Sequence, residues 1–154
     1  MIEIQRMTQE DLKEILVLED QLFSSPWKEE HFLYELEVNP FSSLYIMRDK
    51  NEIVGYGGLW LVFEQADLTS IGIKPSEQGK GYAKRLLRYL IHEAKEAECE
   101  YILLEVRVSN HRAQKLYEQF GFQQVGIKKN YYSDNNEDAI SMCKILVGDE
   151  DERY

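Results

Sequence analysis

The chain has 154 residues, of which 44% are hydrophobic and 30% charged, the composition of a single globular domain large enough to bury a core. Its 18 basic and 28 acidic residues give a formal net charge of −10, which argues against nucleic-acid binding because that function needs a basic surface. No apolar run approaches the roughly 20 residues that cross a bilayer, so we expect no membrane partner.

The first residues and the cysteines suggest a cytoplasmic protein. Residues 1–6 lack a basic flank followed by an apolar run, so we expect no secretory signal. Cys99 and Cys143 are too few for a disulfide framework or a thiolate metal site, and we expect buried thiols. The predicted organisation is one domain over residues 1–147 and a short acidic tail over 148–154. The acidic charge suits a basic peptide or amine partner, although solubility alone also explains it.

The first third of the chain predicts one strand and two helices. Ile2 and Ile4 alternate with polar residues, as in a strand, and apolar residues at helical spacing over 12–22 predict a helix. Pro26 interrupts the pattern. A second helix is expected over 28–38, because it must stop before the Asn-Pro pair that follows.

Three strands follow, joined by tight turns. Their predicted ranges are 44–48, 53–64 and 67–73, with a hairpin turn over 49–52. Gly57-Gly58 lies inside the long middle strand. A glycine pair there predicts either a bulge or a place where a ligand approaches the backbone.

The second half of the chain predicts two helices, a strand between them and a terminal hairpin. Ser109 or Asn110 is expected to cap the second helix, and Gly121 to close it. The predicted ranges are 80–97, 101–106, 111–120, 122–128 and 139–146. The order β-α-α-β-β-β-α-β-α-β-β places one parallel strand–helix–strand crossover in a mostly antiparallel sheet. We therefore expect an α/β fold with a mixed sheet and helices on both faces.

The segment from Ile71 to Ala83 predicts an anion site, because an apolar strand end leads there through a glycine loop into a helix. First-turn N–H groups lack helical partners, and glycine lets the main chain come close to a phosphate. With Lys80, Lys84 and Arg85 adding charge, a diphosphate-bearing ligand is expected. An ordinary strand-to-helix turn explains the same glycines, since the spacing Gln-x-x-Gly-x-Ala matches neither common nucleotide loop.

Glu105 interrupts an apolar strand, where it shares a face with Leu103 while the strand's other apolar residues share the opposite face. A carboxylate on a central strand is costly unless it is solvated or paired. One interpretation is a general base that acts directly or through water. The other is an ion pair with Arg107 or another neighbour in the sheet.

Tyr117 and Asn110 each allow a structural and a functional interpretation. Tyr117 shares a helical stripe with Leu116 and Phe120, which favours a core aromatic with a wet hydroxyl; alternatively, the hydroxyl reaches a cleft and donates a proton. Asn110 by itself is a helix N-cap.

The three histidines indicate neither a nucleophile system nor a metal site. His31, His92 and His111 are scattered, and none lies near a Ser or Cys in a nucleophile pattern. We expect solvated surface histidines, no metal and no covalent intermediate.

Taken in order, three motifs resemble the GNAT N-acetyltransferase superfamily, and the resemblance covers nearly the whole chain. They are the glycine loop, the Leu-Glu-Val-Arg strand at 104–107 and Ser-Asn-x-x-Ala-x-x-Leu-Tyr-x-x-x-Gly-Phe at 109–122. Further segments resemble one branch, the ribosomal-protein-alanine N-acetyltransferases (RimI type). These are Pro26-Trp27, Lys129-Asn130-Tyr131-Tyr132 and Glu137-Asp138-Ala139-Ile140-x-Met142.

The resemblance implies transfer of an acetyl group from acetyl-CoA to an α-amine, by direct attack within a ternary complex. Glu105 would accept a proton from the substrate ammonium, and Tyr117 would donate one to the departing thiolate. A strand end would pair with the pantetheine arm, and main-chain groups of the loop would hold the pyrophosphate. The implied cofactor-binding residues are Ile71, Gly72, Ile73, Gln78, Gly79, Lys80, Gly81, Tyr82, Ala83, Lys84 and Asn110.

The implied substrate is a ribosomal protein N-terminus that begins with Ala. The residues that would line its groove are Pro26, Trp27, Tyr131 and Tyr132. Lys129 stands where this branch often has Arg, and Ser70 and Gly72 stand where Asn and Ala are expected; these departures are compatible with cofactor binding and bear on peptide preference. One alternative is a GNAT enzyme that acts on a small amine such as a polyamine or an antibiotic. Another is a non-catalytic acyl-CoA-binding module, against which the retention of both Glu105 and Tyr117 argues.

Overall fold

The structure, a computed structural model, describes residues 1–149, so the predicted acidic tail lies outside the described residues from position 150 on. The elements are β1 (Ile2–Arg6), η1 (Gln9–Asp11), α1 (Leu12–Leu22), α2 (Glu29–Glu37), β2 (Ser42–Asp49), β3 (Glu52–Val62), β4 (Gln65–Ile73), η2 (Pro75–Glu77), α3 (Tyr82–Glu96), β5 (Tyr101–Arg107), α4 (His111–Gln119), β6 (Gln123–Lys128) and β7 (Ala139–Ile145). The predicted order of helices and strands is confirmed; the two short 3₁₀ turns are additions.

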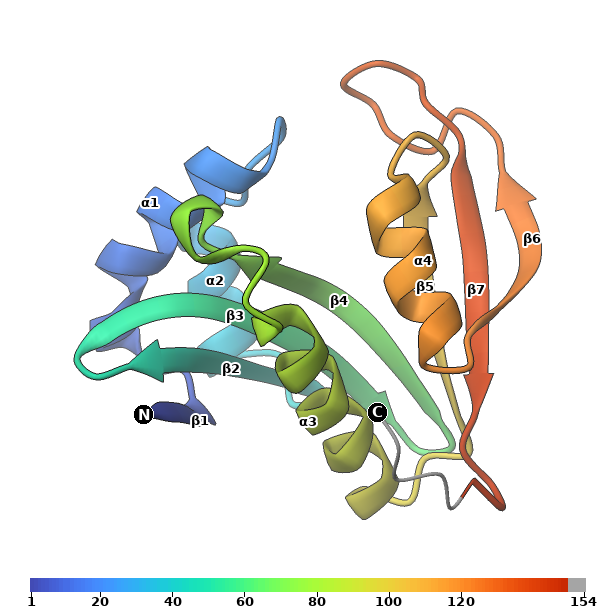
Figure 1. The fold of residues 1–154 in the computed structure, drawn as a ribbon, viewed down its shortest axis with the longest axis horizontal. Coiled ribbons are helices and arrows are strands. Elements are labelled where there is room, and N and C mark those ends of the chain that lie inside the picture. The colour runs from blue at the N-terminus through green and yellow to red at the C-terminus, as the bar shows by residue number, and fades with distance from the viewer. Residues whose placement is uncertain (150–154) are drawn as a thin grey trace.

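One seven-stranded sheet runs in the order β1-β2-β3-β4-β5-β7-β6. Its strand pairs are antiparallel except for β4 and β5, which are parallel and are joined by the crossover through α3. These two strands pair at only three positions, Gln65↔Tyr101, Ala66↔Ile102 and Asp67↔Leu103. Beyond those positions they diverge, which splits the sheet into two arms at the carboxyl ends of both strands (Figure 1). The predicted mixed α/β fold is confirmed.

Helices cover both faces of the sheet, as predicted (Figure 1). On one face, α1 and α2 bury Ile15 and Phe32 against Ile46 and Tyr56. On the other face, α3 and α4 pack against the strands and contribute to a shared core cluster. Their buried residues include Leu86, Leu87, Leu90, Ile91 and Ala94 from α3 and Tyr117 and Phe120 from α4. Each fully buried leucine contributes about 1.5–3 kcal/mol of hydrophobic stabilisation, so these stripes hold the two arms on a shared core.

Gly57-Gly58 forms the predicted bulge rather than a place of ligand approach. The register between β3 and β4 shifts at Gly58/Leu59. A Cβ at Gly57 would lie 2.9 Å from Leu90 Cδ1, and one at Gly58 would lie 2.6 Å from Leu44 Cδ2. The glycines therefore make room for core side chains on the two faces of the sheet.

Local chemistry also sets the limits of the two helices near the split. Gly81 caps α3 in a left-handed conformation with φ 84°, so this helix begins at Tyr82 rather than at the predicted Lys80. Asn110 caps α4, because its Oδ1 accepts from the Ala113 N–H at 3.1 Å. Gly121, with φ 92°, follows the end of α4 as predicted. In the described part of the chain, no helix is long and apolar enough to cross a membrane.

Candidate active site

The split between β4 and β5 opens beside the glycine loop. From Leu68 to Ile73, one edge of β4 has no strand partner in the register with β5. Such an edge presents unpaired N–H and C=O groups, which an extended ligand can use as a sheet neighbour. The predicted pantetheine-binding residues Ile71, Gly72 and Ile73 all lie on this edge.

The loop that follows β4 leads from η2 into the N-terminus of α3. Gly79 and Gly81 both have φ 84°, and no atom of the residues that the structure describes lies within 4 Å of a Cβ placed on either. Arg85 N–H donates to Gly81 O at 3.2 Å, where the helical ladder begins. The first turn of α3 contains no acidic residue. Free N–H groups and open space suit a diphosphate. Lys80, predicted to add charge here, is paired with Glu77 Oε2.

Gln78 has a more specific place than the sequence predicted. Its Nε2 donates to Ile73 O at 3.0 Å, and its Oε1 accepts from Arg112 Nη1 at 3.2 Å. The side chain thus fixes the loop to the end of β4 and to the first turn of α4. Asn110, the predicted cofactor contact on α4, is exposed beside this turn.

The departures from the expected residues have local consequences. A Cβ on Gly72 would lie 2.7 Å from Leu22 Cδ1, so glycine here lets the end of α1 pack closely on β4. Ser70 has a buried hydroxyl without a hydrogen-bond partner among the described residues. Lys129 is exposed, and its Nζ lies 3.4 Å from Asp138 Oδ2.

Glu105 lies on β5 beyond the last position that pairs with β4. Ile102, Leu104 and Val106 are buried on the opposite face, which confirms the predicted alternation. The Glu105 side chain is 26% exposed, and its Oε2 lies 3.5 Å from Lys128 Nζ on β6. The predicted ion pair with Arg107 or another neighbour in the sheet is thus found with Lys128, while Arg107 pairs with Asp134 and Glu137.

Tyr117 is a buried aromatic residue that lies near the predicted substrate residue Tyr132. Its ring meets Phe122 edge to face, with the centroids 5.7 Å apart. Burial raises the pKa of the Tyr117 hydroxyl, and the nearby Tyr132 raises it further. A phenol in this environment keeps its proton, which both a core tyrosine and a proton donor require.

Tyr131 and Tyr132 form an aromatic pair between two cations. Their centroids are 5.1 Å apart at 89°. Arg107 Cζ lies 3.9 Å from the Tyr132 centroid, and Lys128 Nζ lies 5.3 Å from that of Tyr131. Burial raises the pKa of Tyr132 to about 12, against the opposing effect of Arg107. The nearby Glu105 carboxylate raises this pKa by a smaller amount. The two tyrosines therefore lie close to the predicted base.

Pro26 and Trp27 lie in the segment between α1 and α2, residues 23–28. The Trp27 indole packs against Phe32 with the centroids 5.2 Å apart, and its backbone N–H donates to Glu19 Oε1 at 3.0 Å. This segment reaches the loop that carries the two tyrosines, because the Ser24 hydroxyl donates to Asp134 Oδ2. Both predicted acceptor-binding segments thus belong to one region.

Sequence reasoning missed several polar residues in this region. Arg107 was named from the sequence only as a possible partner of Glu105, and its contacts with Asp134, Glu137 and Tyr132 were not predicted. Lys128, Ser24 and Asp134 gave no signal, because their partners are distant in the chain.

The described residues contain no group of three or more His, Cys, Asp or Glu side chains that could hold a metal ion. The three histidines are exposed and lie on different helices. Cys99 is buried and Cys143 half-buried.

The glycine loop at the start of α3 thus lies beside a parallel strand pair that splays apart, an arrangement that suits an extended ligand carrying a diphosphate. Residues 10–122 match the model of the acetyltransferase (GNAT) family. The chain belongs to this family, and it is an acetyl-CoA-dependent N-acetyltransferase.

Similar proteins extend over nearly the whole chain. A Bacillus subtilis (strain 168) protein, named provisionally as a [ribosomal protein bS18]-alanine N-acetyltransferase, is 40% identical over 90% of this chain and 92% of its own length. The Escherichia coli (strain K12) enzyme of that name is 30% identical over 86% of this chain and 90% of its own. The crystal structure of the ribosomal-protein-S18-alanine N-acetyltransferase from Escherichia coli superimposes with a TM-score of 0.88 at 28% identity, covering 100% of this chain and 99% of that one.

Proposed function

We propose that this enzyme acetylates the N-terminal α-amine of a protein in the cytoplasm, and that the substrate is a ribosomal protein beginning with Ala. The observation that carries the proposal is the position of Glu105 on β5, past the last position that pairs with β4, with Tyr132 near it and near Tyr117. The activities named for the similar proteins, which align over most of this chain, support the choice of substrate.

In this proposal the cofactor lies along the free edge of β4, with its diphosphate at the start of α3. Acetyl-CoA supplies the acetyl group as a thioester. The β4 residues Ile71 to Ile73 pair with its arm through backbone groups, and the N–H groups from Gly79 to Lys84 hold its phosphates. Asn110 contacts the arm from α4. These contacts fix the position of the acetyl carbon, and such positioning is the main source of rate in a direct transfer.

Two side chains move protons. Glu105 accepts a proton from the substrate ammonium, directly or through water, so that the nitrogen has a free electron pair. The nitrogen then forms a bond to the acetyl carbon as the carbon–sulfur bond breaks. Tyr117 donates its phenolic proton to the sulfur that leaves and is restored by the proton that the attacking nitrogen loses. Groups in these roles each contribute about 10²–10⁴-fold to a rate. Pro26, Trp27, Tyr131 and Tyr132 line the entrance and hold the first residues of the acceptor.

A test of this function compares three acceptors by mass spectrometry after incubation with acetyl-CoA. They are a peptide beginning with Ala, the same peptide with a blocked N-terminus and an internal lysine, and a polyamine. We expect one acetyl group on the free α-amine of the first peptide and little on the others. Turnover of the polyamine alone would show that the small-amine alternative is correct.

A variant makes the same experiment diagnostic for mechanism. Glu105→Gln should lower kcat about 10²-fold or more while acetyl-CoA binds as before. Glu118→Gln, which changes an exposed carboxylate on α4, is the matched control and should leave kcat unchanged. Cofactor binding without turnover in the unaltered protein would indicate a non-catalytic acyl-CoA-binding module.

A further inference from the structure

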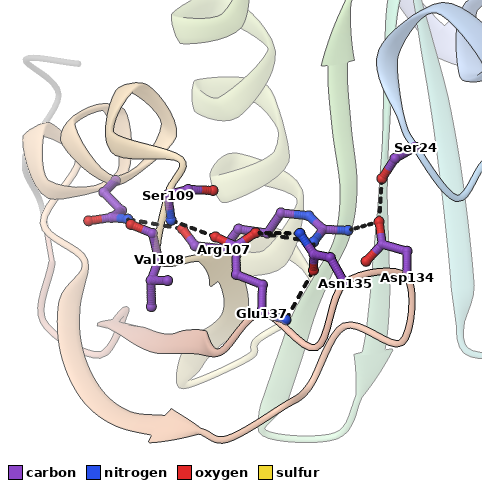
Figure 2. Close-up of polar contacts among 8 residues, drawn as sticks. Ser24, Arg107, Val108, Ser109, Asp134, Asn135 and Glu137 are labelled. Atoms are coloured by element: carbon purple, nitrogen blue, oxygen red, sulfur yellow. Dashed lines mark hydrogen bonds and ion pairs between the residues drawn. The ribbon is translucent and has the colours of Figure 1, made fainter.

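Arg107 is the last residue of β5 and the centre of a polar network (Figure 2). Its Nη2 lies 2.9 Å from Asp134 Oδ2, and its Nη1 lies 3.3 Å from Glu137 Oε1 and donates to Asn135 Oδ1 at 3.2 Å. All three partners belong to the loop of residues 129–138 between β6 and β7. Both terminal nitrogens of the guanidinium are therefore engaged by groups within the protein.

The same guanidinium also holds an aromatic ring of this loop. Arg107 Cζ lies 3.9 Å from the Tyr132 centroid, a contact that fixes the plane of the ring. The backbone of the loop closes on itself beside this ring, with the Tyr132 N–H donating to Glu137 O at 3.1 Å and the Asn136 N–H donating to Tyr132 O at 2.8 Å. Arg107 thus sets both the path of the loop and the direction of Tyr132.

The network continues into α4, which carries Tyr117. Glu137 Oε2 accepts from the Ser109 N–H at 2.7 Å, just before the helix begins. Gln114 Nε2, inside the helix, donates to Arg107 O and to Val108 O, each at 3.0 Å. The end of β5 and the start of α4 are therefore held in one geometry with the loop (Figure 2).

In the other direction the network crosses to the segment 23–28. Asp134 accepts a hydrogen bond from Arg107 and another from the Ser24 hydroxyl. Ser24 and Asp134 are 110 positions apart in the chain. Figure 2 shows this chain of contacts leading from β5 through the loop to Ser24. The two segments that carry the proposed acceptor residues are joined at this point.

We propose that Arg107 is a positioning residue that sets the geometry of the acceptor entrance, by fixing Tyr132 and the 129–138 loop and by linking that loop through Asp134 to Ser24. The inference rests on the proposed function, in which an amine enters on this side of the sheet. Arginine is required because a planar fork can serve several acceptors and stack on a ring at once, whereas a lysine ammonium cannot. Glu105 and Tyr117 then stand in fixed relation to the incoming nitrogen.

The test is a set of variants assayed for KM of the acceptor, kcat and the Kd of acetyl-CoA. Arg107→Gln should raise the acceptor KM about tenfold, equivalent to about 1.4 kcal/mol, and leave the Kd of acetyl-CoA within about twofold. Arg107→Lys should fail to restore the acceptor KM. Ser24→Ala removes only the link to the 23–28 segment and should raise this KM by a smaller factor. Arg88→Gln, at an exposed arginine on α3, is the control.

Hydrogen exchange shows whether the effect is local. Arg107→Gln should increase exchange in residues 129–138 while the amides of β2 and β3 stay protected, which also shows that the variant is folded. An unchanged acceptor KM, or a Kd for acetyl-CoA that weakens in parallel, would overturn the proposal. If the unaltered enzyme acetylates a polyamine instead of a peptide, the proposed substrate fails, and the KM for that polyamine then tests Arg107 in the same way.

Discussion

Tyr117 combines burial with a position beside the proposed acceptor site. Tyr117→Phe removes the hydroxyl and keeps the ring that packs against Phe122. If the hydroxyl protonates the leaving sulfur, kcat should fall about 10²-fold or more, with acetyl-CoA affinity unchanged. Stopped assays of CoA release, together with Tm measurements, separate the two interpretations. A full kcat with an unchanged Tm would make Tyr117 a core aromatic only.

Tyr89→Phe is a matched control for that experiment. Tyr89 is a half-buried tyrosine on α3, where burial also raises the pKa of the hydroxyl, and its ring packs edge to face on Tyr45. Its loss of a hydroxyl should leave kcat unchanged. A similar fall in both variants would indicate a general effect of removing buried hydroxyls.

Single residues differ in how far the sequence predicted them. The face of Glu105 follows from the period of two in a strand, so its separation from Leu104 and Val106 could be predicted. The ion-pair partner of Glu105 could not be predicted. Lys128 lies on β6, which is separated from β5 by β7, so the contact depends on the strand order of the whole sheet. The cap at Asn110 is a contact with Ala113 three residues along the chain, which explains why the sequence was sufficient there.

At the scale of elements, Glu19 joins α1 to two neighbours. The residue is 5% exposed, and its carboxylate accepts from the Tyr56 hydroxyl on β3 and from the Trp27 N–H in the segment 23–28. Glu19→Ala leaves both donors without an acceptor, so we expect unfolding to become easier by about 1–3 kcal/mol. Urea unfolding measures this change. Glu30→Gln, at an exposed glutamate on α2, should have no measurable effect.

The same residue gives a stability that depends on pH. Burial raises the pKa of Glu19 above its usual 4.5, despite the opposing hydrogen bond from Trp27. A raised pKa means that the folded state binds the proton more tightly than the unfolded state does. Protonation of Glu19 therefore adds to the free energy of unfolding in full below pH 4.5, and this addition is lost as pH rises through the raised pKa. Glu19→Gln should remove this part of the pH dependence. An unchanged slope in that variant would show that another group causes it.

Contacts between elements that are distant in the chain could not be predicted from the sequence. Helices α1 to α4 and the strands could be predicted from the spacing of apolar residues and from caps and turns, all of which are local in the sequence. The order of these elements was then sufficient to predict the parallel crossover. The link from Ser24 to Asp134 has no such local cause. It depends on how the 129–138 loop folds over the end of β5, and that path is set by Arg107, whose partners follow it by 27 to 30 positions.

At the scale of the whole molecule, the sheet is joined at its centre by only three paired positions of β4 and β5. A ligand that pairs with the free edge of β4 and reaches α4 through Asn110 bridges the two arms. Acetyl-CoA should therefore stabilise the fold, by about 2.7 kcal/mol at a hundredfold excess over its Kd. Exchange protection should rise in 71–73 and 79–84. A higher Tm without protection in these residues would place the cofactor elsewhere.

Two glycines in the same conformation make this prediction specific. Gly81 and Gly148 have φ values of 84° and 78°, and none of the described residues lies within 4 Å of a Cβ on either. Alanine at each position should carry a similar backbone cost, about 1–2 kcal/mol. Gly81→Ala, however, also places a methyl group where the diphosphate must meet the start of α3, so it alone should abolish the rise in Tm with acetyl-CoA. Equal losses in both variants would mean that the cofactor responds to overall stability and that the open space at Gly81 has no part in binding.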